Sequence, residues 1–184
     1  MKVGPLLGMT IAVAVIVAPT VAQRPPLLVI WNASPSVPVG LYLVTQASPH
    51  IGDLAVLRLP PVIAAFAARR GYLLTSAYLL KPIAAVTGDL VCRFGERILV
   101  RGVLAGIAED ADSDGNAMPT WQGCRVLQMG EVFVLADHPA SFDSRYFGPL
   151  DTASILGRAV LLWSHRSAVR RPARRVRGAR IARL

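Results

Sequence analysis

Short apolar runs, separated by turn residues, dominate the chain beyond its first 26 residues. Runs of this length and composition are typical of β-strands. Gly52-Asp53 and Gly88-Asp89 each place a turn directly before such a run. One alanine-rich segment, residues 62–70, follows Pro60-Pro61 and is predicted to be helical. The sequence therefore predicts a mainly β domain, a bent antiparallel sheet or barrel with one short helix, with strands at residues 27–31, 40–44, 54–57, 80–86, 90–93, 98–103, 132–136 and 155–163.

The N-terminal segment from Val3 to Ala22 carries no charge and is preceded by Lys2. Twenty residues are just long enough to cross the hydrocarbon core of a bilayer, and a flanking lysine favours the cytoplasmic side. We therefore expect a retained anchor over residues 1–23. The alternative is a signal peptide that is cleaved after the small residues around Ala22. In both cases the rest of the chain lies outside the cytoplasm, and a retained anchor would hold it on the periplasmic side of the inner membrane.

The chain has two cysteines, Cys92 and Cys124, and three histidines. An even number of cysteines in an exported chain suggests a disulfide, which here would close a loop of about 33 residues. Two cysteines so far apart, with so few histidines, match no zinc-binding spacing, so no metal site is expected. Residues 109–123 lie inside this loop, are acidic and rich in turn residues, and are expected to be an exposed excursion.

Positive charge is concentrated at the C-terminal end. Residues 166–184 contain eight arginines and no acidic residue, and so account for most of the formal net charge of +9. Such a tail is most often a solvated end of the chain. It can also lie on anionic lipid or bind nucleic acid without sequence preference. We expect it to be separate from the domain at residues 24–165 and to have no specific nucleic-acid partner.

Lys81 is the only lysine outside the N-terminal segment, in a chain with eighteen arginines. Its neighbours, Leu79-Leu80 before it and Pro82-Ile83 after it, are apolar. Burial lowers the pKa of a lysine, so a buried Lys81 would be a general base, which arginine cannot be. The natural partner of a lone lysine base is a serine nucleophile. Alternatively, the stem of Lys81 packs on a strand while its amine reaches water.

Two further segments carry polar residues in rigid surroundings. The segment from Asn32 to Tyr42 has two serines, Ser34 and Ser36, that are two positions apart and flanked by prolines. Such a turn can present one hydroxyl and the adjacent amide, although plain surface turns have the same composition. The second segment has many polar groups beside aromatic ones and reads Ser141-Phe142-Asp143-Ser144-Arg145-Tyr146-Phe147-Gly148-Pro149. This composition suggests either buried support for a site or an Asp–Arg pair that ties down a loop.

The order of these segments resembles that of the Ser/Lys type I signal peptidases. A serine turn and a Gly-Asp turn precede the lysine strand. The strand is followed by three further segments: a second Gly-Asp, then Ser-x-Asp-Ser-Arg-Tyr-Phe-Gly, then Ile-x-Gly-Arg-Ala. Ser-Val-Pro-x-Gly-Leu-Tyr, Leu-Leu-Lys-Pro and the paired cysteines look more narrowly like the TraF-type conjugative-transfer peptidases. General signal peptidases have methionine and arginine where this chain has Val37 and Pro82. The resemblance covers about residues 27–163 and implies the signal-peptidase fold, with its catalytic domain at residues 24–165.

The resemblance also implies a role for six residues. Ser36 matches the nucleophile and Lys81 the general base. Ser34 matches the hydroxyl that stabilises the oxyanion together with the Ser36 N–H. Ser141 matches the serine that orients the lysine amine. Asp143 and Arg145 match the supporting acidic and basic positions. In the TraF-type branch the acid is proposed to matter directly.

The activity implied by the resemblance is that of a membrane-bound serine endopeptidase. Its partner would be an exported precursor, a conjugative pilin or another component of the transfer apparatus, and it would need no metal or other cofactor. The same residues would also serve an acyl transferase that joins pilin ends, because an amine can resolve an acyl-enzyme. A chain without activity would instead be an envelope component of a conjugation or secretion channel. The residues leave these alternatives and the oligomeric state open.

Overall fold

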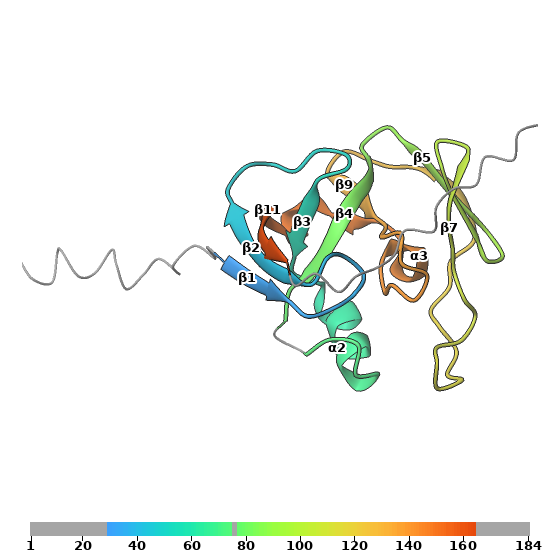
Figure 1. Ribbon diagram of the computed structural model, residues 1–184. Coiled ribbons are helices and arrows are strands. Elements are labelled where there is room, and N and C mark those ends of the chain that lie inside the picture. Colours follow the sequence, from blue (N-terminus) through green and yellow to red (C-terminus); the bar gives the residue numbers. More distant parts are fainter. Residues whose placement is uncertain (1–28, 75–76, 165–184) are drawn as a thin grey trace, which may run out of the picture.

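The computed structural model describes residues 29–74 and 77–164, which form two antiparallel sheets and two short helices (Figure 1). The larger sheet has seven strands in the order β1 (Val29–Asn32), β2 (Gly40–Thr45), β11 (Ile155–Ser164), β3 (Leu54–Leu57), β4 (Leu79–Val86), β9 (Glu131–Val134) and β10 (Leu150–Asp151). The smaller sheet has four strands in the order β7 (Val103–Ile107), β6 (Arg97–Val100), β5 (Leu90–Phe94) and β8 (Gly123–Val126). The expected mainly β, bent antiparallel fold is confirmed.

The strand β11 lies inside the larger sheet and pairs with both β2 and β3. Both pairings contain a register shift, and such bulges bend a strand and increase its twist. Close pairing with β2 requires glycine at position 157, since a Cβ there would collide with the carbonyl oxygen of Thr45. The last strand predicted from the sequence is thus the one that joins the two halves of the larger sheet.

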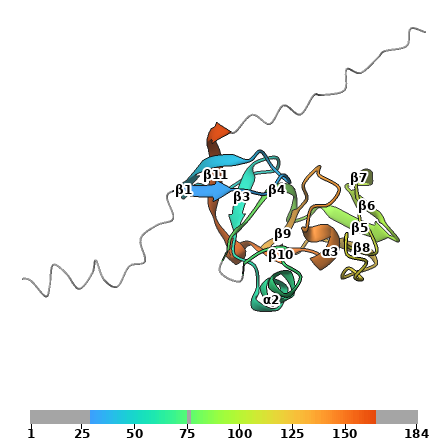
Figure 2. The same cartoon turned by 60° about the horizontal axis from the view of Figure 1, so that its bottom comes forward.

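Helix α2 (Pro61–Arg69) lies beside the larger sheet, at the end where β3 leads into β4 (Figure 2). The first N–H groups of a helix have no partner within it, so proline, which lacks an N–H, is well suited to the first position. The helix begins at Pro61, one residue before the predicted start. Ile63 and Ala64 turn one side of the helix toward a core that includes Leu57, Ile83 and Val134. A second core, under the smaller sheet, contains Val91, Ile98, Phe133 and Tyr146.

The smaller sheet was predicted least well. Residues 98–103 do not form one strand, because Arg101 and Gly102 have positive φ angles of 51° and 78° and turn the chain back between β6 and β7. Two residues with positive φ are typical of a tight hairpin turn. The sequence also missed β8, β10 and all of β7 but its first residue, together with the four-residue helix α3 (Ser144–Phe147) and the short 3-10 turn η1 (Thr152–Ser154).

A disulfide joins Cys92 of β5 to Cys124 of β8, which are directly paired in the smaller sheet. Most of the segment between residues 109 and 123 is exposed, as expected, but the Asp112 side chain is only 8% exposed. None of the helices in residues 29–74 and 77–164 is long and apolar enough to span a bilayer. The predicted anchor at 1–23 and the arginine-rich tail at 166–184 lie outside the described residues.

Candidate active site

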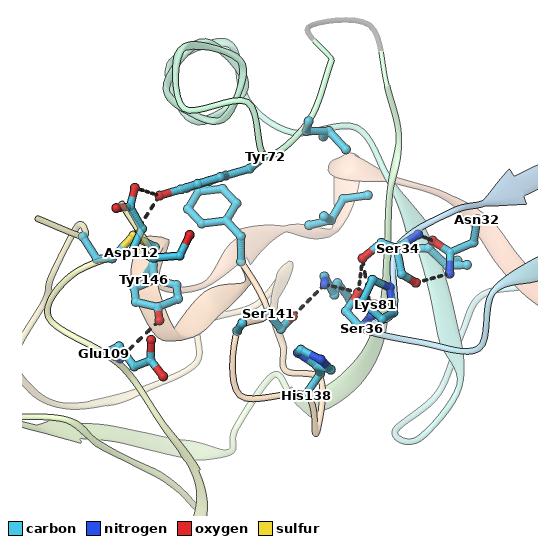
Figure 3. Close-up of a pocket in the computed structure, with 18 of the residues that line it drawn as sticks. Asn32, Ser34, Ser36, Tyr72, Lys81, Glu109, Asp112, His138, Ser141 and Tyr146 are labelled. Atoms are coloured by element: carbon cyan, nitrogen blue, oxygen red, sulfur yellow. Dashed lines mark hydrogen bonds between the residues drawn. The ribbon is translucent and has the colours of Figure 1, made fainter. Parts of the chain in front are cut away.

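A cavity of about 430 Å³ runs from the loop after β1, past the start of β4, to the end of α2 and the 109–118 segment (Figure 3). Hydroxyl groups and one amine gather at one end, where Ser34, Ser36, Lys81 and Ser141 lie together. A second polar group, Tyr72 with Asp112, lies at the opposite end. The cavity therefore brings together four of the six site residues that the sequence suggested.

Lys81 is the only lysine among the described residues, and it is buried, with 3% of its surface exposed. Its Nζ lies 2.6 Å from the Oγ of Ser36 and 2.6 Å from the Oγ of Ser141. Burial lowers the pKa of Lys81 to about 8, with smaller and opposing influences from Asp143, which raises it, and Arg145, which lowers it. A lysine with a pKa of about 8 is roughly one-tenth neutral at pH 7, and the neutral share rises with pH. The burial of the amine does not fit the snorkelling alternative.

The serine turn between β1 and β2 is held from within by Asn32. The Asn32 Nδ2 donates to the carbonyl oxygens of Ser34 at 2.8 Å and of Val37 and Pro38 at 3.1 Å each. Its Oδ1 accepts from the Ser34 N–H at 3.2 Å. The hydroxyl of Tyr42, from β2, donates to the Pro38 carbonyl at 2.6 Å. These contacts fix the backbone on both sides of Ser36, so the turn is not a plain surface turn.

Ser34 and Ser36 contact each other directly, with their Oγ atoms 3.0 Å apart. The backbone N–H of Ser36 also points at the Ser34 Oγ, at 3.4 Å. The Ser34 hydroxyl and the Ser36 N–H therefore lie beside the Ser36 hydroxyl, in contact with each other. Both groups can donate, and two donors at one place can stabilise an oxyanion that develops on a carbonyl attacked by Ser36.

Ser141 is positioned by the chain segment that leads into α3. Its N–H donates to the carbonyl of His138, whose side chain lines the same end of the cavity (Figure 3). Asp143 caps α3, and its carboxylate accepts from the Arg145 N–H at 3.2 Å and from the Arg145 Nε at 2.8 Å. The same carboxylate accepts from the Ala136 N–H at 3.1 Å. Asp143 has no hydrogen bond to Lys81 among the described residues, so it acts on the amine only through charge and through the placement of Ser141.

Arg145 is nearly fully buried, and its guanidinium binds backbone as well as Asp143. It donates to the carbonyl oxygens of Ile107 at 3.0 Å and Pro139 at 3.1 Å. The pair thus fastens the 136–141 loop to the end of β7. This geometry agrees with the Asp–Arg pair that was one of the two interpretations of the segment.

Three contributions were missed from the sequence. Asn32 was noted only as part of its segment, and nothing in the sequence shows its four backbone contacts. Arg93 is buried in β5 and donates to the Arg145 carbonyl at 2.7 Å; a lone arginine inside an apolar run was the available signal. The contact between Tyr72 and Asp112 joins segments that are 40 residues apart, and no local pattern indicates it.

The chain is similar in sequence to known proteins. The family described as signal peptidase, peptidase S26, matches residues 1–164. A conjugal transfer protein TraF from Agrobacterium fabrum is 36% identical over 140 residues, which are 70% of this chain and 78% of that protein. A plasmid transfer protein TraF from Escherichia coli is 33% identical over 146 residues, 72% of this chain and 82% of that protein.

Among solved structures, a signal peptidase I from Enterococcus faecalis matches 62% of this chain and 98% of its own length, with 21% identity and a TM-score of 0.37. The family match covers nearly the whole chain, and the relatives exceed 30% identity over most of their own length. The chain therefore belongs to the S26 signal peptidase family and, within it, to the TraF type.

Proposed function

We propose that the chain is a serine endopeptidase in which Ser36 is the nucleophile and Lys81 the general base. The observation that carries the proposal is the buried Lys81 amine, which lies 2.6 Å from the hydroxyl of Ser36. A structural protein gains nothing from burying a cation whose pKa is then lowered. A peptidase gains a neutral amine in contact with the hydroxyl that it must deprotonate.

The reaction follows from these contacts. Neutral Lys81 takes the proton of the Ser36 hydroxyl while the Oγ attacks a peptide carbonyl. The Ser34 hydroxyl and the Ser36 N–H turn toward the developing oxyanion, and each such donor is typically worth about 3 kcal/mol of transition-state stabilisation. The Lys81 ammonium then protonates the leaving amine. Water, activated by the same lysine, releases the acyl group from Ser36.

The biological substrate is proposed from the relatives. Both TraF relatives are named as transfer proteins, one conjugal and one of a plasmid. We infer that this chain processes an exported precursor of a conjugation apparatus, such as a pilin. The products distinguish the two chemistries that Ser36 allows, because hydrolysis adds a water to the released chain whereas joining of its two ends does not.

The proposed location is the outer side of the inner membrane. One face of the larger sheet supports it, because paired positions on β1, β2 and β11 place apolar side chains side by side. Trp31 and Trp163 stack at 5.9 Å and are 53% and 54% exposed. This apolar face consists of Val29, Trp31, Leu43, Val160 and Trp163. The uncharged segment at residues 3–22 ends only a few residues before β1, so an anchor there would hold the face near lipid.

The test is the mass of a pilin precursor after co-expression with the intact chain, with Ser36→Ala or with Lys81→Arg. We expect both variants to abolish processing while the protein still accumulates in the membrane, because arginine stays protonated and cannot act as a base. Ser34→Ala should be milder, since the backbone donor remains. Full processing by Lys81→Arg would contradict the proposal.

A further inference from the structure

The cavity extends well beyond the hydroxyl of Ser36, and its walls there are largely apolar. Leu73, Leu79, Met118 and Phe142 line this part. Leu79 lies two positions before Lys81 on β4, and Phe142 directly follows Ser141. The apolar part is therefore built on the same two segments that position the amine, at a fixed place relative to the nucleophile.

An aromatic cluster makes one wall of this part rigid. The ring of Phe142 contacts Phe66 at 5.8 Å, Tyr72 at 5.3 Å and Tyr146 at 6.1 Å between centroids. Packed aromatic rings hold one another in place and present a large apolar surface. Phe142 cannot move away without breaking these contacts, so the wall is formed before any ligand binds.

The far end of the cavity is closed by a contact between the residues that follow α2 and the 109–118 segment. The Tyr72 hydroxyl donates to the Asp112 carboxylate at 2.5 Å, and the Arg70 guanidinium donates to it at 3.0 Å. The hydrogen bond from Tyr72 holds the pKa of Asp112 well below its usual range, so the carboxylate stays charged. Burial, followed by the neighbouring Asp112, raises the pKa of Tyr72 to about 12, so the phenol stays a donor.

The polar atoms at this end satisfy one another. Asp112 also accepts from the backbone N–H of Asn116 at 2.8 Å, and Tyr72 lies within 3.3 Å of the Met118 sulfur. A ligand group that meets the Tyr72–Asp112 contact therefore finds its polar atoms already partnered. A polar group would lose water against this contact without gaining a new partner, so apolar groups fit there. The Glu109 side chain also lines the cavity and is a separate polar group.

We propose that this part of the cavity binds one large apolar side chain of the precursor, of the size of phenylalanine, leucine or methionine, and that the Tyr72–Asp112 contact forms its closed end. The proposal deepens the proposed function and rests on it for the identity of the ligand. The whole cavity, with its hydroxyl-rich end included, has a volume of about 430 Å³, which is in the range of sites that bind small molecules, so it has room for more than small side chains such as alanine. The gain in affinity comes from apolar surface that leaves water.

The test measures binding without catalysis. The full chain carrying Ser36→Ala, in detergent micelles, is titrated with capped seven-residue alanine peptides that contain one phenylalanine, moved through each position. We expect one position at which phenylalanine binds at least tenfold tighter than alanine, with leucine and methionine close behind and aspartate showing no gain. Equal affinities, a preference for alanine, or no measurable binding of any peptide would overturn the proposal.

Two further variants locate the pocket. Asp112→Asn should reduce the preference for phenylalanine over alanine at least threefold, because the closed end loses its charged acceptor. Asp89→Asn is the matched control: Asp89 also pairs with an arginine at 3.0 Å and accepts a backbone N–H, but it does not line the cavity. Tyr72→Phe keeps the ring and should give the same loss as Asp112→Asn. An unchanged preference in both Asp112→Asn and Tyr72→Phe would contradict the placement.

Because Ser36 is already replaced, these affinities do not depend on turnover. A chain that selects phenylalanine but never processes a precursor would support the pocket and contradict the peptidase. A chain that processes precursors without regard to side-chain size would do the reverse.

Discussion

At the scale of single residues, Lys81 is a residue whose placement costs stability. In water its pKa is near 10.5, and burial lowers it to about 8. Below pH 8 the folded protein therefore holds an ammonium that would be better solvated in the unfolded chain. Two serine hydroxyls offset part of this cost. The balance explains why the position is a lysine: a residue chosen for stability alone would be apolar, and an arginine would stay charged.

Lys81→Met should make the protein more stable at pH 7, by about 1–3 kcal/mol, since each unit of pKa shift corresponds to about 1.4 kcal/mol. The sign follows from proton counts. Between pH 8 and 10.5 the unfolded chain binds more protons at Lys81 than the folded one, so the wild type gains stability as pH rises. The advantage of Lys81→Met should therefore shrink toward pH 10. Denaturant titrations at pH 7 and pH 10 measure this, and a variant less stable than wild type at pH 7 would contradict it.

At the scale of elements, the long strands and α2 were predictable because their apolar runs and prolines are local signals. The parts that were missed depend on contacts that are remote in sequence. The segment of β8, Gly-Cys-Arg-Val, is mostly exposed and takes its strand form from pairing with β5. Helix α3 has only four residues and depends on the Asp143 cap and on the buried Arg145.

The candidate site divides in the same way. Lys81 could be singled out from its apolar surroundings, and Ser36 and Ser141 from the resemblance of their segments to the Ser/Lys peptidases. Asn32 and the Tyr72–Asp112 contact could not, because an asparagine that holds a turn and an aspartate that closes a cavity look like ordinary polar residues in a sequence. Their roles appear only when the hydrogen bonds are known.

The serine turn provides a prediction at this scale. Asn32→Ala removes the side chain that holds three carbonyls and one N–H of the turn, and should lower kcat by about 10- to 100-fold with a smaller change in KM, as expected for a displaced nucleophile. Gln128→Ala is a suitable control, because its amide also donates to a backbone carbonyl but lies outside the cavity. Steady-state kinetics on a peptide substrate measure both. A change in KM alone would mean that Asn32 serves binding and not the placement of Ser36.

At the scale of the whole molecule, β1 connects the apolar face of the larger sheet to the end of the cavity that contains Ser36. The apolar face is formed in part by β1, and the serine turn follows the same strand. If this face lies on lipid, Ser36 is close to the membrane surface, where an exported precursor emerges. The arginine-rich segment 166–184 follows β11 in sequence, and we propose that it adds attraction to anionic headgroups without a part in the chemistry.

The three tryptophans of the chain allow a test of this orientation. We expect brominated lipids to quench the fluorescence of Trp31 and Trp163 in the reconstituted full-length chain, because both lie on the apolar face. Trp121 should not be quenched, since it packs on Phe133 in the core under the smaller sheet. Three variants with one tryptophan each, the others being replaced by phenylalanine, separate the signals. Quenching of Trp121 alone would place the smaller sheet at the membrane instead.

The central claim, that Lys81 is neutral enough to be the base for Ser36, can be measured directly because the chain has only two lysines. The full-length chain is labelled with [¹⁵N-ζ]lysine, and the two Nζ signals are followed by NMR as the pH is raised; Lys81→Arg assigns them by removing one. We predict that the Lys81 signal titrates with a pKa of about 8. A Lys81 signal that titrates near 10.5 would contradict the account, because the amine would then be protonated at neutral pH and unable to accept the proton of Ser36.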